Sequence, residues 1–197
     1  MIIKAIFCDV DGVLFQQNER FSVKYSNEFG IPINKMNAYL DNDFDLCLTG
    51  KDNLKLRLTD LLEEWKWKGT VDELTYYWYG KESIPHKKFI DFLNSLDRSN
   101  IKLFLASQNE KYKMTRMMDQ LEPLIKYDHL IATYQVGYKK SNPLYFTTCL
   151  EKYNLKPNEV VLIDNNIKAI NCAKSVGIST IFFESEIQAI FELRKMF

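Results

Sequence analysis

The chain has 197 residues, and its 26 Lys and Arg balance its 26 Asp and Glu, so the formal net charge is zero. That balance excludes a strongly basic nucleic-acid-binding protein. Hydrophobic residues make up 46% of the sequence beside only 7 Gly and 5 Pro, which excludes a disordered or fibrous chain and indicates one globular domain, or a domain with a modest insertion.

The first predicted element is a strand over residues 2–8, and a long insertion follows it. About seventy residues separate Phe15 from His86, where a single crossover helix would need far fewer. One helical face is formed by Leu54, Leu58, Leu61, Leu62 and Trp65, and the pattern continues after Gly69 with Leu74, Tyr77 and Trp78. We therefore predict an all-helical insertion over residues 16–83, docked on a core made of residues 1–15 and 84–197.

After the insertion, apolar stretches alternate with amphipathic ones. Strands are expected at 101–106, 130–134, 160–163 and 180–183, and helices at 87–96, 113–121, 143–153, 167–176 and 187–196. Continuous apolar stretches are typical of strands buried on both faces. This order predicts an α/β fold with a Rossmann-like, doubly wound, parallel sheet of five strands.

Two acidic residues come directly after the first strand. Asp9 and Asp11 precede Gly12, and ligands of open α/β sheets bind at the carboxyl ends of the strands. An EF-hand is excluded, because its third acid would have to precede the glycine. A solvated acidic turn that caps the next element is the alternative for this segment taken alone.

Two other strands also end in small polar residues. The strand at 101–106 leads into Ser107, and the strand at 160–163 leads into Asp164. Each of these residues could be a helix N-cap, as could Asn166. Three neighbouring strand ends that carry Asp, Ser and Asp favour a common site over three coincident caps.

Three acidic residues would meet at this edge of the sheet: Asp9, Asp11 and Asp164. They would repel one another unless a cation compensates, and Mg²⁺ fits three acids without nearby His or Cys because it prefers oxygen ligands. A hydroxyl from Ser107 and a lysine would then suit a phosphoryl group. Lys139 and Lys140 both precede the helix at 143–153, and periodicity does not choose between them.

Together these segments resemble the four motifs of the haloacid dehalogenase-like (HAD) hydrolase superfamily. The matching positions are Asp9-x-Asp11-Gly12-x-Leu14, Ser107, Lys140 and Asp164. Lys140 matches the third motif better than Lys139, because Asn142-Pro143 and Phe146 then fall in place. The insertion resembles the small helical cap of subfamily I, which includes phosphoglycolate phosphatases, β-phosphoglucomutases and sugar phosphatases.

The resemblance implies a role for each motif residue. Asp9 would be the nucleophile that forms an aspartyl-phosphate, and Asp11 the general acid and base. Mg²⁺ would be held by Asp9, the main-chain carbonyl of Asp11 and Asp164, while Ser107 and Lys140 would bind phosphoryl oxygens. Because the dehalogenases lack the second acid, Asp11 indicates a phosphatase or a phosphomutase. Closure of the cap would exclude water and select the substrate.

Two positions depart from the family pattern. The fourth motif commonly has a second acid where this chain has Asn165, which removes one negative charge from the metal site, and Ser141 stands where proline commonly follows the lysine. Asn109, two residues after Ser107, and Asn165 are additional candidates for the site.

We therefore expect a magnesium-dependent phosphomonoester hydrolase that acts on a small phosphorylated metabolite. A phosphomutase of the β-phosphoglucomutase type is one alternative, since it would use the same residues while protecting the aspartyl-phosphate from water. A regulatory protein that binds a phosphorylated ligand without turnover is the other. Asn165 is compatible with it, although binding alone does not require Asp9 and Asp11.

Other conspicuous residues are expected to be structural. The acids of residues 41–45 lack the glycine of a calcium loop, so we predict a solvated loop. The aromatic run at 76–79 is expected to pack between helices of the insertion. A basic cluster of Lys111, Lys113 and Arg116 lies on a predicted helix and does not indicate nucleic-acid binding.

The cysteines and the N-terminus bear on the cellular location. The four cysteines are Cys8, Cys47, Cys149 and Cys172. They form no C-x-x-C pair, so we expect reduced thiols in the core. The apolar runs fall far short of the roughly 20 residues that cross a bilayer, and residues 1–8 lack a basic segment or a cleavage site. We expect a cytoplasmic protein without a membrane or nucleic-acid partner.

Overall fold

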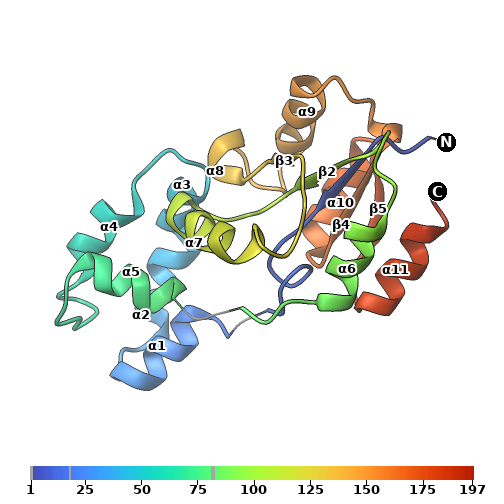
Figure 1. Ribbon diagram of the computed structural model, residues 1–197. Helices are drawn as coiled ribbons and strands as arrows, with labels where there is room; N and C mark the ends of the chain where they lie inside the picture. The colour runs from blue at the N-terminus through green and yellow to red at the C-terminus, as the bar shows by residue number, and fades with distance from the viewer. Residues whose placement is uncertain (1, 18, 81–82) are drawn as a thin grey trace.

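The computed structural model describes residues 2–17, 19–80 and 83–197, and it consists of a parallel sheet with a group of helices beside one end of the sheet (Figure 1). The strands are β1 (Ala5–Cys8), β2 (Lys102–Leu105), β3 (His129–Leu130), β4 (Val160–Asp164) and β5 (Ser179–Phe182). They form a five-stranded sheet in the order β3-β2-β1-β4-β5, and all four pairings are parallel. The predicted α/β fold class is confirmed.

Helices cover both faces of the sheet. One face packs against α6 (Lys87–Ser95), α7 (Lys111–Leu121) and α11 (Glu186–Arg194), and the other against α9 (Pro143–Lys152) and α10 (Ile167–Ser175). Along β1, Ile6 and Cys8 enter the first apolar cluster while Ala5 and Phe7 enter the second. Alternate side chains of a strand point to opposite faces, so a strand buried on both sides is apolar throughout.

Between β1 and α6 lies a group of helices with an apolar cluster of its own, which we call the helical unit. Its elements are α1 (Phe21–Phe29), α2 (Ile33–Ala38), the π-helical turn η1 (Tyr39–Asp43), α3 (Phe44–Leu48), α4 (Leu54–Leu61) and α5 (Val71–Tyr79). Tyr25, Leu58, Trp65 and Leu74 are fully buried in its cluster. The Tyr25 hydroxyl donates to the Trp65 carbonyl at 2.8 Å, which ties α1 to the turn that follows α4.

The two chain segments that join the helical unit to the sheet lie side by side. The Gln16 N–H donates to the Ile84 carbonyl at 2.8 Å, and the His86 N–H donates to the Leu14 carbonyl at 2.8 Å. The predicted boundaries at 15/16 and 83/84 fall on this paired segment, and residues 18 and 81–82 of the predicted insertion lie outside the described residues. The division into a core and an inserted unit remains a prediction.

The structure corrects two local predictions. The stretch 130–134 does not continue as a strand: β3 ends at Leu130, and the short helix α8 (Thr133–Val136) follows, in which the Val136 N–H donates to the Ala132 carbonyl at 3.1 Å. The acids of 41–45 do not form a loop but lie in η1 and α3. Helical backbone is favoured there because it buries Tyr39 and Cys47 in the cluster of the helical unit.

Two further observations concern the cysteines and the membrane. All four cysteines are buried and none is in a disulfide. Among the described helices, none combines the length and the apolar character needed to span a bilayer.

The helices on the second face of the sheet end just before Tyr153, for α9, and just before Val176, for α10. Between α9 and β4, the short 3₁₀ helix η2 (Pro157–Glu159) leads into the strand.

Candidate active site

The register of the sheet brings the ends of three strands to one edge. β1 pairs with β2 on one side and with β4 on the other. Asp9 follows β1, and its N–H donates across to the Ile163 carbonyl of β4 at 2.9 Å. Asp164 is the last residue of β4, and Ser107 lies two residues beyond β2. These three polar residues therefore lie where the carboxyl ends of the strands meet.

Lys140 joins two of the acids in the interior. Its Nζ lies 2.7 Å from Oδ1 of Asp9 and 2.7 Å from Oδ2 of Asp164. All three residues are buried: the exposed fractions are 6% for Asp9, 2% for Lys140 and 0% for Asp164. Lys139 instead pairs with Asp45 of the helical unit. The structure thus places Lys140, and not Lys139, between the acids.

The charges of this cluster are not balanced. Burial and the charge of Asp164 raise the pKa of Asp9 to about 7, although Lys140 opposes the shift. Burial lowers the pKa of Lys140, but the two carboxylates outweigh it and hold that pKa above its ordinary value. Two carboxylates therefore share one ammonium group in a dry environment, where excess charge is costly. A hard cation with a preference for oxygen, such as Mg²⁺, fits this donor set.

Asp11 has partners of its own. The Nζ of Lys113 lies 2.8 Å from its Oδ1, and Nδ2 of Asn109 donates to its Oδ2 at 2.5 Å. Burial raises the pKa of Asp11, but Lys113 and Asn109 outweigh it and hold the pKa below its ordinary value. Within the described part of the chain, no three His, Cys, Asp or Glu side chains converge on one metal position. A cation at Asp9 and Asp164 would need further ligands, such as main-chain carbonyls.

Asn109 connects the acid with the predicted phosphate ligand. Besides Asp11, its Nδ2 lies 2.6 Å from Oγ of Ser107 and 3.3 Å from Sδ of Met117. Ser107 is fully buried and Asn109 is 4% exposed. Because Ser107 Oγ accepts this hydrogen bond, its own hydrogen can be donated elsewhere. Asn109, an additional candidate in the sequence, thus contacts two of the predicted site residues.

Asn165 lies over the loop that follows β1. Gly12 has a φ of +84°, and a Cβ atom there would lie 2.0 Å from Nδ2 of Asn165. The positive φ and the close approach of Asn165 both disfavour a side chain at position 12, which accounts for the glycine after Asp11. The neighbouring Asn166 caps α10: its Oδ1 accepts from the Lys168 N–H at 2.9 Å.

The alternative reading of Ser107 as a helix cap is wrong. Glu110 begins α7, and its carboxylate accepts from the Tyr112 N–H at 2.8 Å and from the Lys113 N–H at 2.6 Å. Asp164 does not begin a helix either, although its Oδ1 accepts from the Asn166 N–H at 2.7 Å. Capping therefore does not prevent these residues from contacting the site: Asp164 pairs with Lys140, and Ser107 accepts from Asn109.

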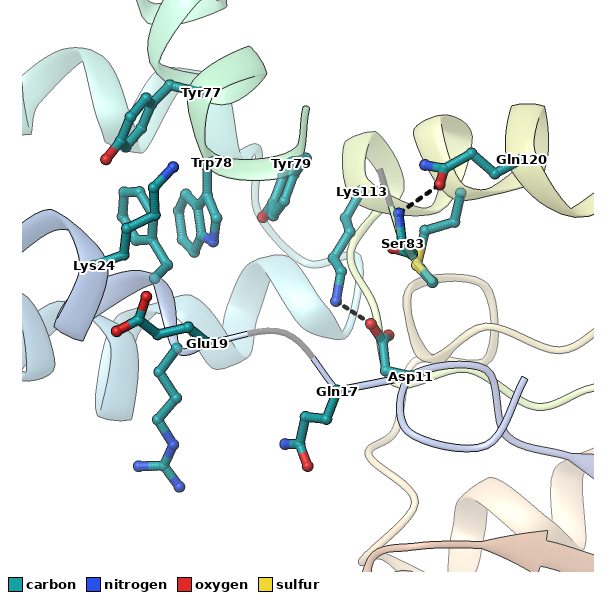
Figure 2. A pocket seen from close by; sticks show the side chains of 13 residues that line it. Asp11, Gln17, Glu19, Lys24, Tyr77, Trp78, Tyr79, Ser83, Lys113 and Gln120 are labelled. Atoms are coloured by element: carbon teal, nitrogen blue, oxygen red, sulfur yellow. Dashed lines mark hydrogen bonds and ion pairs between the residues drawn. The ribbon is translucent and has the colours of Figure 1, made fainter. Parts of the chain in front are cut away.

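A cavity of about 250 Å³ opens beside Asp11, between the sheet and the helical unit (Figure 2). The lining includes Asp11, Lys113, Met117 and Gln120 on the sheet side and Glu19, Arg20, Phe21, Lys24, Tyr77, Trp78 and Tyr79 on the side of the helical unit. Phe21 and Trp78 stack with their ring centres 4.2 Å apart. The predicted packing of the aromatic run within the helical unit is confirmed for Tyr77, Trp78 and Tyr79, which also line this cavity, whereas Tyr76 is exposed.

Lys113 is the site residue that sequence reasoning missed. The sequence shows it only as part of a basic cluster on a predicted helix, whereas its ammonium group pairs with Asp11. A usable signal is its position four residues after Asn109, near the start of a helix that follows a site-bearing strand. The signal can be used only if the helix starts at Lys111, as α7 does. The periodicity instead predicts a start at Lys113.

Comparison with known proteins supports the family assignment. A family model described as haloacid dehalogenase-like hydrolase matches residues 3–177. Among curated proteins, bifunctional epoxide hydrolase 2 of Mus musculus is 30% identical over 93 residues, which is 47% of this chain and 16% of that protein. The chain therefore spans only about a sixth of that relative. Glyceraldehyde 3-phosphate phosphatase of Pyrococcus furiosus is 24% identical over 92% of this chain and 81% of that protein.

Solved structures share the fold over nearly the whole chain. A predicted HAD-like family hydrolase from Porphyromonas gingivalis has a TM-score of 0.78 and 25% identity and covers 99% of both chains. An HAD-family enzyme from Bacteroides thetaiotaomicron, solved in complex with magnesium and inorganic phosphate, has a TM-score of 0.76 and 18% identity and covers 93% of this chain and 95% of its own. At 18% identity the second likeness concerns the fold alone.

Proposed function

The chain belongs to the haloacid dehalogenase-like hydrolase family, and we propose that it is a magnesium-dependent phosphomonoesterase that acts on a small phosphorylated metabolite. The observation that carries the proposal is the buried arrangement of Lys140 between Asp9 and Asp164, with Asp11 two residues after Asp9 at the edge of a cavity. The distant similarity to a phosphatase over most of the chain supports the same reaction.

The first half of the proposed reaction transfers the phosphoryl group to the protein. An oxygen of the Asp9 carboxylate attacks phosphorus, a new P–O bond forms, and the ester P–O bond breaks. Asp11 gives a proton to the leaving oxygen, so an alcohol departs. In the structure Lys113 and Asn109 favour the ionised form of Asp11, so Asp11 must gain a proton before this step.

The second half restores the protein. Water attacks the phosphorus of the aspartyl-phosphate, Asp11 accepts the proton of the water, and inorganic phosphate leaves with Asp9 free again. Lys140 and the Ser107 hydroxyl would contact the phosphoryl oxygens as their charge increases. Asp9, Asp164 and the main-chain carbonyl of Asp11 would hold Mg²⁺, which would supply positive charge that offsets the charge on the phosphoryl oxygens.

The helical unit would be the cap of this site. It provides Tyr77, Trp78 and Tyr79 to the wall of the cavity opposite Asp11. Its two connections to the sheet are paired through the Leu14–His86 and Gln16–Ile84 hydrogen bonds, and we expect the unit to close over the site about this paired segment. Such closure would exclude water while the leaving group is bound.

The experiment is the hydrolysis of 4-nitrophenyl phosphate by the purified protein, with and without Mg²⁺. We expect turnover that depends on Mg²⁺ and that falls by on the order of 10³-fold or more in Asp9→Asn, because the amide does not attack phosphorus. Asp41→Asn is the control, since Asp41 is an exposed acid on η1. Turnover of Asp9→Asn close to that of the unchanged protein would contradict the covalent mechanism.

The products separate the alternatives. Release of inorganic phosphate supports a phosphatase, whereas net transfer of the group to a sugar phosphate would indicate a phosphomutase. Binding of a phosphomonoester that is not turned over, without a metal-dependent beryllium fluoride adduct on Asp9, would indicate a binding protein, and the hydrolase proposal would then be wrong.

A further inference from the structure

Lys113 lies on the wall of the cavity next to Asp11, and Figure 2 shows its side chain extended toward the carboxylate. The ion pair measures 2.8 Å, and the Lys113 and Asp11 side chains are 30% and 38% exposed, so the pair borders the cavity and is not sealed from it. The backbone of Lys113 is fixed because its N–H donates to Glu110 at 2.6 Å. Only the flexible side chain can adjust to a ligand.

The ammonium group of Lys113 keeps unused hydrogen-bonding capacity. A lysine ammonium has three donors, and Oδ1 of Asp11 takes one of them. Among the described residues, no second acidic side chain forms an ion pair with Lys113. A ligand in the cavity can therefore accept a hydrogen bond from Lys113 while the contact with Asp11 persists.

Among the described residues that line the cavity, the charged ones have a positive excess. The cationic ones are Arg20, Lys24 and Lys113, and the acidic ones are Asp11 and Glu19. Within the described ranges, neither Arg20 nor Lys24 takes part in an ion pair. The Nζ of Lys24 lies instead 4.0 Å from the centre of the Tyr77 ring. A positive excess in a narrow cleft attracts a ligand group of negative charge.

The size of the cavity limits the ligand. Its volume is about 250 Å³, and a water molecule in the liquid occupies about 30 Å³. A chain of a few carbon atoms with one polar end fits this space. Because Asp11 gives its proton to the leaving oxygen in the proposed reaction, the part of the substrate that enters this cavity is the leaving group.

From these four observations we infer that Lys113 determines specificity: it binds an anionic group, a carboxylate or a second phosphate, on the leaving group of a small phosphomonoester. The inference rests on the proposed function, because it assigns the cavity to the leaving group. Lys113 thereby holds Asp11 and the substrate at the same time, which aligns the ester oxygen with its proton donor.

The test uses three phosphomonoesters with the same three-carbon chain, which end in a hydroxyl, a carboxylate or a second phosphate. We expect the unchanged full-length protein to have a higher kcat/KM for the carboxylate or the phosphate than for the hydroxyl. In Lys113→Met, which keeps the length of the side chain but removes the charge, we expect this preference to fall at least 10-fold, with most of the change in KM for the anionic substrates.

Two further variants serve as controls. Lys111→Met removes an exposed lysine from the first turn of the same helix, so it should keep the preference. Lys113→Arg keeps the positive charge and should restore a large part of the preference. We also expect Lys113→Met to hydrolyse the hydroxyl-ended substrate more slowly, because the contact with Asp11 is lost. The ratio of kcat/KM for an anionic substrate to kcat/KM for the hydroxyl-ended one therefore isolates the contact with the substrate.

The outcomes separate this inference from the proposed function. If the protein hydrolyses all three esters with equal kcat/KM, or if Lys113→Met lowers the three values by the same factor, Lys113 only positions Asp11 and the inference is wrong. If none of the three esters nor 4-nitrophenyl phosphate is hydrolysed, the proposed function itself fails. A preference for the carboxylate over the second phosphate, or the reverse, identifies the anionic group.

Discussion

At the scale of single residues, the site separates its acids by giving them different neutralising partners. Asp9 shares Lys140 with Asp164, whereas Asp11 pairs with Lys113 and accepts a hydrogen bond from Asn109. Burial and the charge of Asp164 raise the pKa of Asp9, whereas Lys113 and Asn109 outweigh burial and lower that of Asp11. Environments that move two neighbouring acids in opposite directions are typical of sites where the acids have different tasks.

This difference predicts that Asp9→Asn stabilises the protein in the absence of metal. In the folded state the pKa of Asp9 is about 7, above its ordinary value of 3.8, so folding favours the protonated form. Its stabilising effect is present below about pH 4, decreases as the pH rises, and is lost above pH 7. Asparagine mimics the protonated form at every pH and removes one of the two charges around Lys140.

The measurement is thermal unfolding in EDTA at pH 5 and pH 8. We expect Asp9→Asn to raise the free energy of unfolding by on the order of 1–3 kcal/mol at pH 8, since one pKa unit corresponds to about 1.4 kcal/mol, and by less at pH 5. Asp41→Asn is again the control. A destabilised Asp9→Asn at pH 8 would mean that the charge of Asp9 is already compensated without metal.

At the scale of elements, helix starts decide which side chains reach the site. Glu110 caps α7, so the helix begins at Lys111 and the side chain of Lys113 points toward Asp11. In the helical unit, Thr70 and Glu73 form a capping box at the start of α5, the helix that carries Tyr77, Trp78 and Tyr79 to the cavity. Each cap satisfies N–H groups that the helix itself leaves unpaired.

We predict that Thr70→Ala destabilises the helical unit by about 1 kcal/mol, because Glu73 N–H loses its acceptor and α5 frays at its start. Urea unfolding followed by tryptophan fluorescence measures the change, since Trp65 lies in the cluster of the helical unit. Thr115→Ala is the matched control: its exposed hydroxyl bonds only to the Lys111 carbonyl one turn earlier. Equal losses in both variants would rule out the capping contribution.

At the scale of the whole molecule, two kinds of contact hold the helical unit on the sheet domain. The polar contacts include the Lys139–Asp45 ion pair and the hydrogen bond from the Tyr112 hydroxyl to Asn53 at 3.2 Å. The aromatic ring of Tyr112 also packs against the cluster of the helical unit. The ion pair is 36% and 40% exposed, and exposed ion pairs contribute little to stability.

A double-mutant cycle with Asp45→Asn and Lys139→Met tests whether this ion pair contributes less to the attachment of the helical unit than the packing of Tyr112. We expect a coupling energy below about 1 kcal/mol that decreases further in 0.5 M salt, because water and ions screen an exposed pair. Replacement of Tyr112 by alanine should cost more than either single change. A coupling energy of several kcal/mol would show that the ion pair is a principal attachment of the helical unit.

The sequence by itself determined the fold class, the family and the edge of the sheet at which the polar residues gather. Strands buried on both faces must be apolar throughout, and Asp9, Ser107 and Asp164 interrupt three of them where they end. The strands and the polar residues at their ends are local in the chain, so periodicity and spacing suffice to find them, whereas the family was inferred from the resemblance of four motifs.

Only the tertiary structure decided which side chains meet. It turned Lys113 toward Asp11 and ended β3 at Leu130. The family resemblance already favours Lys140 over Lys139, and the structure adds its contacts with Asp9 and Asp164. The direction of a side chain depends on where a helix begins and how it packs, and a shift of one residue rotates it by about 100°. That information lies in contacts such as the Glu110 cap, which join residues only after the chain has folded.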